Sequence, residues 1–136
     1  MQFQSSESRR DLYPEIEAYA SGMMATDGVH QVYWEASGNP KGKPMLVLHG
    51  GPGGATKPGM RRYFDPKVWN VFMFDQRGCG RSRPHASVEA NTTWHLVADV
   101  ERIRQALGID SFVGFGGSWG ATLALLYAQA HPDRTT

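Results

Sequence analysis

Three short apolar runs at wide spacing constrain the fold of this chain more than any other feature. They read MLVLH at 45–49, VFMFD at 71–75 and FVGF at 112–115. A strand with one face in water alternates polar and apolar residues, whereas a strand buried on both faces is apolar throughout. The three runs therefore predict buried strands of a largely parallel sheet that helices cover on both sides.

Two helices are expected to alternate with these strands. The first has its N-cap at Asn91, Thr92 or Thr93 and ends at Gly108. Its expected inner stripe is Val97, Val100, Ile103 and Leu107, and its expected outer face carries Asp99, Glu101, Arg102 and Arg104. The second helix, roughly residues 119–130, is apolar nearly all round and is expected to be buried. Strands that alternate with helices predict an α/β fold.

The two ends of the chain carry different signals. Residues 1–20 are expected to form a loosely ordered N-terminal arm, followed by a hairpin in which Asp27-Gly28 joins segments 23–26 and 29–36. The strand at 112–115 is apolar on both faces, and nothing after the last helix is available to pair with its far edge. We therefore expect residues 1–136 to be the N-terminal portion of a single larger domain.

The composition argues against nucleic acid or membranes as partners and against disulfides and metal sites. The net charge of +1 gives no electrostatic reason for binding nucleic acid or an anionic membrane. The sequence has no apolar run of about eighteen residues and no secretory leader. A single cysteine, Cys79, rules out an internal disulfide framework and fits the reducing cytoplasm. No histidine or cysteine cluster has the spacing of a metal site, so we expect neither metal nor cofactor.

A serine stands between the third predicted strand and the second predicted helix. The segment Gly116-Gly117-Ser118-Trp119-Gly120 matches the G-x-S-x-G pattern. In this pattern the serine sits on a very tight turn that exposes its hydroxyl, and the flanking glycines remove side chains that would collide there. The N-terminus of the following helix favours developing negative charge. The motif and its context predict that Ser118 is a nucleophile.

Two other interpretations of this segment compete with the nucleophile. Serine is a common N-cap, so Ser118 could simply cap the helix. Residues 114–120 could also form a dinucleotide-binding loop, but the spacing is one residue too long and Trp119 would crowd a pyrophosphate. The candidate ribose ligand Asp133 follows a helix, whereas that fold places such a residue at a strand end. The context of strand and helix favours the nucleophile.

A glycine-rich loop, HGGPGG at 49–54, follows the first apolar run and is the candidate oxyanion site. In an α/β-hydrolase layout one donor is the N–H after the nucleophile, here that of Trp119, and the other comes from this loop. Pro52 has no N–H. His49 is a possible general base, but the order of the triad in this fold favours a structural role. A merely flexible turn is the alternative for the whole loop.

The residues after the second apolar run allow two interpretations. Asp75, Gln76 and Arg77 belong either to the floor of a site or to a turn tied by an Asp–Arg pair, and we favour the turn. Cys79 lies between two glycines and is expected to be a small packed residue rather than a nucleophile.

Together these segments resemble the proline iminopeptidases, serine peptidases of the α/β-hydrolase fold. The residues that carry the resemblance are LHGGPGG at 48–54, FDQRGCGRSRPHAS at 74–87, NTTWHLVADVERIR at 91–104 and GGSWGATLALLYAQAHPDR at 117–134, with YWEASGNPKGKP at 33–44. The similarity covers the chain from about Tyr13 onward. It implies an α/β-hydrolase core with an N-terminal hairpin and mostly parallel strands, and peptides with N-terminal proline as substrates.

By this resemblance Ser118 attacks the prolyl carbonyl, and Gly51 and Trp119 supply the oxyanion-hole amides. The residues expected to shape the site are His49, Gly50, Pro52, Gly53, Gly116, Gly117 and Gly120. No cofactor or metal is implied. The family's catalytic aspartate and histidine, its cap domain and its C-terminal strands lie outside this segment, so we expect residues 1–136 alone to be inactive. The alternatives are another α/β-hydrolase, such as an esterase or amidase, and a non-catalytic binding domain.

Overall fold

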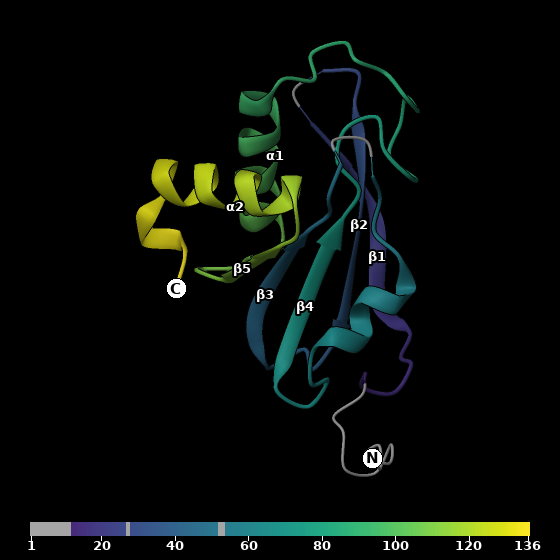
Figure 1. Ribbon diagram of the computed structural model, residues 1–136, viewed down its shortest axis with the longest axis vertical. Helices are drawn as coiled ribbons and strands as arrows, with labels where there is room; N and C mark the ends of the chain where they lie inside the picture. Colours follow the sequence, from purple (N-terminus) through teal and green to yellow (C-terminus); the bar gives the residue numbers. More distant parts are fainter. Residues whose placement is uncertain (1–11, 27, 52–53) are drawn as a thin grey trace, which may run out of the picture.

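The computed structural model describes residues 12–26, 28–51 and 54–136 and contains one five-stranded sheet (Figure 1). In space the strands follow the order β1-β2-β4-β3-β5. Their bounds are Ala18–Ala25 for β1, Gln31–Gly38 for β2, Lys43–Leu48 for β3, Trp69–Phe74 for β4 and Val113–Gly116 for β5. The helices are α1, Thr93–Ala106, and α2, Trp119–Ala130, with short 3₁₀ helices η1 at Pro58–Tyr63 and η2 at Pro132–Arg134.

The three apolar runs form the parallel half of this sheet, as predicted. β3 lies between β4 and β5 and pairs with both of them in parallel. β2 pairs antiparallel with β4 on one side and with β1 on the other, so the N-terminal hairpin extends the sheet. The carboxyl ends of β3, β4 and β5 therefore meet at one edge, which is where open α/β sheets bind ligands.

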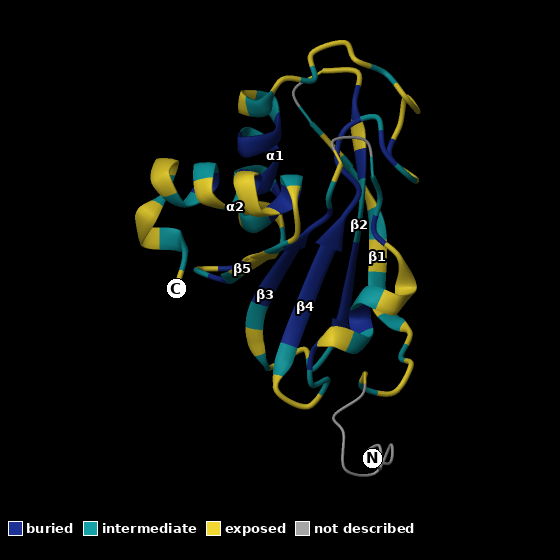
Figure 2. Cartoon of the chain, in the orientation of Figure 1, coloured by how far each residue is buried: buried dark blue, intermediate teal, exposed yellow. Residues whose placement is uncertain are grey.

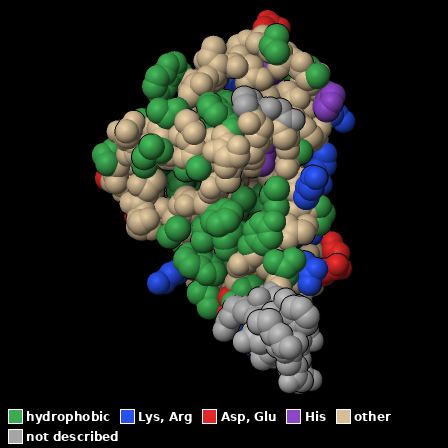
Figure 3. Space-filling model, viewed as in Figure 1, with side chains coloured by type: hydrophobic (Ala, Val, Ile, Leu, Met, Phe, Trp, Pro, Cys, Tyr) green, Lys and Arg blue, Asp and Glu red, His purple; other side chains and the backbone are tan. Residues whose placement is uncertain are grey.

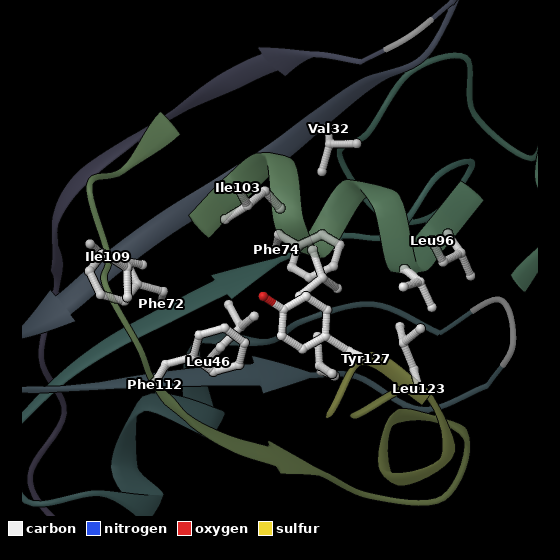
Figure 4. Packing of buried hydrophobic residues seen from close by; sticks show 14 residues of the cluster. Val32, Leu46, Phe72, Phe74, Leu96, Ile103, Ile109, Phe112, Leu123 and Tyr127 are labelled. Carbon is white, nitrogen blue, oxygen red and sulfur yellow. The ribbon is translucent and has the colours of Figure 1, made fainter. Parts of the chain in front are cut away.

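Alternate residues of the central strands enter two separate apolar clusters. Leu46 and Leu48 of β3 and Phe74 of β4 face the larger cluster with α1 and α2 (Figure 4). Met45 and Met73 face the other side, where they pack with Phe64 and neighbouring residues. Because both faces of β3 and β4 are covered, their runs show no polar alternation. The third strand, β5, was also predicted to be buried, but none of its residues is buried in the described structure. Within the described residues, however, α1 and α2 both cover the larger cluster, and the members of the smaller cluster that lie outside the strands, Met60 and Phe64, come from η1 and its C-cap.

Helix α1 follows its predicted boundaries. The Thr92 hydroxyl accepts a hydrogen bond from the His95 amide, and the His95 ring accepts one from the Thr92 amide, which forms a capping box. Gly108 has φ of 68° and follows the last turn. Val97, Val100 and Ile103 are buried as expected, and Leu107 is partly buried (Figure 2).

Two helix predictions are wrong. Asp99 was expected on the outer face of α1 but is completely buried, because it lies three residues after Leu96 and four before Ile103 and so shares their inner stripe. Helix α2 was expected to be buried, but only Gly120, Leu123 and Tyr127 are. It packs on the sheet through one face, and its other face, which includes Leu125 at 60% exposure, is open in the described structure (Figure 2).

The N-terminal segment also differs in part from expectation. The hairpin is present, but β1 already begins at Ala18, within the segment predicted to be an arm, because it pairs with β2 as far as Ser37. Residues 1–11 of that arm and Asp27 of the hairpin turn lie outside the described residues.

Candidate active site

Ser118 lies in the turn between β5 and α2 in a strained backbone conformation. Its φ of 55° and ψ of −121° fall outside the regions that L-residues favour. Such a conformation costs on the order of 1–3 kcal/mol and persists only where the surroundings impose it. Its side chain makes no capping hydrogen bond to α2, so the cap interpretation lacks the contact that it requires. The serine is exposed at the edge where the parallel strands end.

Two glycines of the motif are required by close packing. A Cβ on Gly120 would lie 1.9 Å from the Leu48 carbonyl oxygen, and one on Gly116 would lie 2.3 Å from the Gly120 carbonyl carbon. Without a side chain at Gly120, the start of α2 can lie directly against the end of β3. Without one at Gly116, the turn can close around Ser118. A Cβ on Gly117 would meet nothing within 4 Å. Close backbone approach therefore explains positions 116 and 120 of the motif but not position 117.

Replacing Gly120 with alanine is expected to lower the free energy of unfolding by about 3 kcal/mol, the upper end for overpacking a tight site. The cost arises because the contacted atom is a backbone carbonyl, which cannot move aside as a flexible side chain would. Denaturant unfolding measures the change. Gly117→Ala is the matched control and is expected to change stability by less than about 0.5 kcal/mol. Equal losses in the two variants would contradict this explanation.

The loop after β3 lies directly against this turn. An ideal Cβ on Gly50 would lie 3.3 Å from the Gly117 carbonyl oxygen and 3.6 Å from Ser118 Cβ. The next residue, Gly51, is exposed and has φ of 130°, a value that favours glycine. The structure thus brings Gly50 of the predicted loop to Ser118, with His49 before it and Gly51 after it in the chain. Pro52 and Gly53, also predicted to shape the site, lie outside the described residues.

Trp119 directly follows Ser118, so its backbone N–H lies beside the serine. As the first residue of α2, it has no carbonyl partner for this group within the helix. The aligned peptide dipoles of α2 add partial positive charge at this end. A carbonyl oxygen that gains negative charge beside Ser118 would therefore meet a favourable field.

His49, at the end of β3, is buried and engaged through both ring nitrogens. Its Nε2 accepts a hydrogen bond from the backbone N–H of Gln76 at 2.9 Å. Its Nδ1 therefore carries the proton and donates to the Gly50 carbonyl oxygen at 2.9 Å. Burial lowers the pKa of His49, although the Gly50 carbonyl and the Asp75 carboxylate act in the opposite direction. A neutral imidazole with both nitrogens engaged is suited to holding the loop and not to taking a proton from Ser118.

The residues after β4 form a buried polar network. Asp75 accepts hydrogen bonds from the Thr56 amide and hydroxyl, at 2.8 and 2.7 Å, and from the Arg81 amide at 2.9 Å. The favoured Asp–Arg turn is present only in part, since the nearest Arg81 side-chain nitrogen lies 3.6 Å from Asp75. Arg77 pairs instead with Asp99 of α1, at 2.6 and 2.9 Å.

Gln76 is the site residue whose role the sequence did not reveal. Its side chain donates to the His49 carbonyl oxygen at 3.0 Å and accepts from the Trp119 indole N–H at 3.0 Å. The sequence left Gln76 as a possible part of a site floor, the alternative that was not favoured, and did not reveal these contacts. Gln76, Cys79 and Trp119 also line a cavity of about 470 Å³. Cys79 is buried and donates weakly to the Arg77 carbonyl oxygen, in keeping with a packed residue.

The described residues bring no general base to Ser118. No hydrogen bond in this part of the chain joins its hydroxyl to a histidine or carboxylate. His131 follows α2 thirteen residues after Ser118, which corresponds to roughly 20 Å along a helix. Among the described residues there is also no group of three or more His, Cys, Asp or Glu side chains that could hold a metal. No helix in the same residues is long and apolar enough to cross a membrane.

Comparisons with known proteins find relatives that cover most of this chain. A probable proline iminopeptidase of Leptolyngbya boryana is 57% identical over 125 residues, which cover 92% of this chain and 39% of the relative. A proline iminopeptidase of Arabidopsis thaliana is 54% identical over 129 residues, covering 95% of this chain and 34% of the relative. The resemblance found in the sequence is thereby confirmed. The chain spans well under half the length of these curated relatives.

Solved structures share the fold of this chain. A proline iminopeptidase-related protein from Thermus thermophilus superposes with a TM-score of 0.72 at 33% identity, over 84% of this chain and 41% of that one. A proline iminopeptidase of Mycobacterium smegmatis gives 0.71 at 29% identity, over 85% and 41%. The family model described as the alpha/beta hydrolase fold matches residues 43–135. The strained serine, the packed glycines and these matches show that the chain belongs to the α/β-hydrolase fold family.

Proposed function

We propose that the protein that carries this chain is a serine aminopeptidase that releases N-terminal proline from peptides. The observation that carries the proposal is the geometry of Ser118, held at φ of 55° between two close-packed glycines and against the Gly50 backbone. The substrate class is supported by identities of 52–57% to proteins named as proline iminopeptidases. The alternatives, an esterase or amidase and a non-catalytic binding domain, have no comparable support.

In this proposal Ser118 is the nucleophile. Its oxygen attacks the prolyl carbonyl while its proton passes to a base, and the carbonyl oxygen becomes an oxyanion that accepts hydrogen bonds from the Gly51 and Trp119 amides. Collapse breaks the peptide bond, the shortened peptide leaves with a proton on its new amino terminus, and a prolyl ester remains on Ser118. Water then hydrolyses the ester and regenerates the serine hydroxyl. No step requires a metal or cofactor.

The other residues of the site have supporting roles. Gly116, Gly117 and Gly120 form the turn, and His49, Gly50, Pro52 and Gly53 shape the oxyanion loop. We propose that residues 1–136 are the N-terminal portion of one catalytic domain, with residues 1–20 as its arm. The base, its acid partner and the groups that bind the substrate amine are proposed to come from other parts of the protein, as relatives more than twice as long would provide. A cytoplasmic location is proposed from the single cysteine.

Three substrates test the proposal in the complete protein: a prolyl anilide, a leucyl anilide and a simple acetate ester. The expected result is a kcat/KM for the prolyl anilide that exceeds the value for the leucyl anilide by at least about tenfold, the range that one pocket can discriminate. Residues 1–136 alone are expected to turn over none of them. Faster hydrolysis of the acetate ester would indicate an esterase. A folded protein that reacts with no substrate and no fluorophosphonate probe would indicate a binding domain.

A further inference from the structure

Gln76 links the loop after β3 to the start of α2, next to Ser118. It lies just beyond β4, with 2% of its surface exposed. Its side-chain amide donates to the His49 carbonyl oxygen on the β3 side and accepts from the Trp119 indole on the α2 side, each at 3.0 Å. Its backbone N–H donates to His49 Nε2 at 2.9 Å. One residue therefore contacts the ends of both elements that carry the expected oxyanion donors.

The chemistry of these contacts fixes the orientation of the Gln76 amide. The His49 carbonyl can only accept, and the Trp119 indole N–H can only donate. Rotation of the amide by half a turn would place its oxygen against the carbonyl oxygen and its NH₂ against the indole N–H. The bridge thus requires a side chain that offers a donor and an acceptor in fixed relation, which a carboxylate or a thioether does not.

The bridge acts close to the expected oxyanion donors. On one side it holds His49, two residues before Gly51, and the His49 ring in turn holds the Gly50 carbonyl. On the other side it holds the indole of Trp119, the residue whose own backbone N–H is the second donor. A shift of either loop would change the separation of the two amides and with it their fit to an oxyanion.

We propose that Gln76 is a positioning residue of the oxyanion site, which sets the separation of the Gly51 and Trp119 amides through its hydrogen bonds to His49 and to the Trp119 indole. This inference rests on the proposed role of Ser118 as nucleophile. Gln76 itself touches no reacting atom. Its effect is therefore expected in the transition state and not in substrate binding, which means in kcat and not in KM.

The main variant is Gln76→Met in the complete protein. Methionine keeps a similar length but offers neither hydrogen bond. Removal of one oxyanion donor costs about 10²–10³ in kcat, and displacement of one costs less, so we expect kcat for a prolyl anilide to fall by about 10–100-fold. KM is expected to stay within about threefold. Gln105→Met, the same change at an exposed position of α1, is the matched control and should leave both constants unchanged.

A second variant, Trp119→Phe, removes only the indole donor and keeps an aromatic ring. It also tests the bridge if Gln76→Met does not fold. The two changes are combined in a double-mutant cycle. If the bridge acts as one unit, the double variant should be no slower than the slower single variant. Losses in kcat that multiply would show that the two residues act separately and would overturn the proposal.

Folding and labelling measurements separate a positioning role from a structural one. Each variant is compared by thermal unfolding and by the rate at which a fluorophosphonate probe labels Ser118, since that reaction also develops charge on an oxygen beside the serine. The expected result is slower labelling by Gln76→Met at an unchanged folded fraction. Unchanged labelling and kcat, or a loss of activity that merely follows the loss of folded protein, would overturn the proposal.

The same probe distinguishes this inference from the proposed substrate. If the wild-type protein is labelled at Ser118 but does not hydrolyse the prolyl anilide, the proline specificity is wrong. The labelling rates of Gln76→Met and Trp119→Phe would then still decide whether Gln76 positions the oxyanion donors.

Discussion

Replacing Ser118 with alanine is expected to lower kcat for a prolyl anilide by about 10⁶-fold in the complete protein, the scale on which serine hydrolases lose activity without their nucleophile. Alanine lacks the hydroxyl that is proposed to form the acyl-enzyme. The turn itself should persist, because the close contacts that define it involve the backbones of Gly116, Gly120 and Leu48. Initial rates measure the loss, and fluorophosphonate labelling should disappear with it.

The control for this variant is Ser111→Ala, which removes a hydroxyl seven residues earlier in the chain, ahead of β5. It should retain wild-type rates and labelling. Circular dichroism and thermal unfolding should show that both variants are folded. If folded Ser118→Ala kept more than about a hundredth of the wild-type kcat, a nucleophile elsewhere in the protein would have to be responsible.

Replacing Asp99 with alanine is expected to lower the free energy of unfolding by about 3–5 kcal/mol, the cost of removing one partner from a buried ion pair. Both carboxylate oxygens of Asp99 accept from the Arg77 guanidinium, and both side chains are completely buried. The variant leaves the Arg77 charge in the interior without the carboxylate that contacts two of its nitrogens. Denaturant unfolding at neutral pH measures the change.

Asp110→Ala is the matched control for this second variant. Asp110 also pairs with an arginine, Arg134, at 3.0 Å, but its side chain is 94% exposed. Exposed pairs contribute little because water and salt screen them. Little change is therefore expected in the control, and equal losses in the two variants would show that burial of the Arg77–Asp99 pair is not what matters.

The buried pair also bears on the site. Arg77 follows Gln76 directly, and its side chain ties the end of β4 both to Asp99 of α1 and to the Ala90 carbonyl oxygen at 2.6 Å. The Asn91 side chain returns a hydrogen bond to the Arg77 carbonyl oxygen at 2.9 Å. These contacts fix the backbone from which Gln76 reaches His49 and Trp119, so activity in Asp99→Ala should be compared at equal folded fraction.

An apolar surface accompanies the β5 edge of the sheet. Figure 3 shows hydrophobic side chains gathered between β5 and η1 on the face turned toward the viewer. Phe115 of β5 packs edge-on against Phe64 with ring centroids 5.1 Å apart, and it also contacts Tyr63. Phe115 remains 42% exposed and Tyr63 51% exposed. The smaller apolar cluster, on the η1 side of the sheet, therefore reaches the surface here, in contrast to the larger cluster under α1 and α2.

Local sequence patterns were sufficient for much of the fold. The apolar runs predicted β3 and β4, because a strand buried on both faces needs apolar residues at every position. The third run predicted β5 as a strand, although none of its residues is buried in the described structure. The N-cap of α1 near Thr92 and its end at Gly108 were also predicted, since both depend on residues within one turn of the helix. The same holds for the turn at Ser118, where the G-x-S-x-G pattern encodes the backbone contacts that the turn requires.

Tertiary structure decided which polar groups are buried together. Asp99 pairs with a residue 22 positions away, and Gln76 binds partners 27 and 43 positions away. Likewise, α2 is apolar all round, yet only the side that meets the sheet is covered in the described structure. The sequence by itself determined the strands, the start and end of α1 and the turn at Ser118, because short-range sterics and burial patterns govern them. The partners of Asp99 and Gln76 depend on which strand ends the sheet brings together. The periodicity of one segment does not indicate which strands become neighbours.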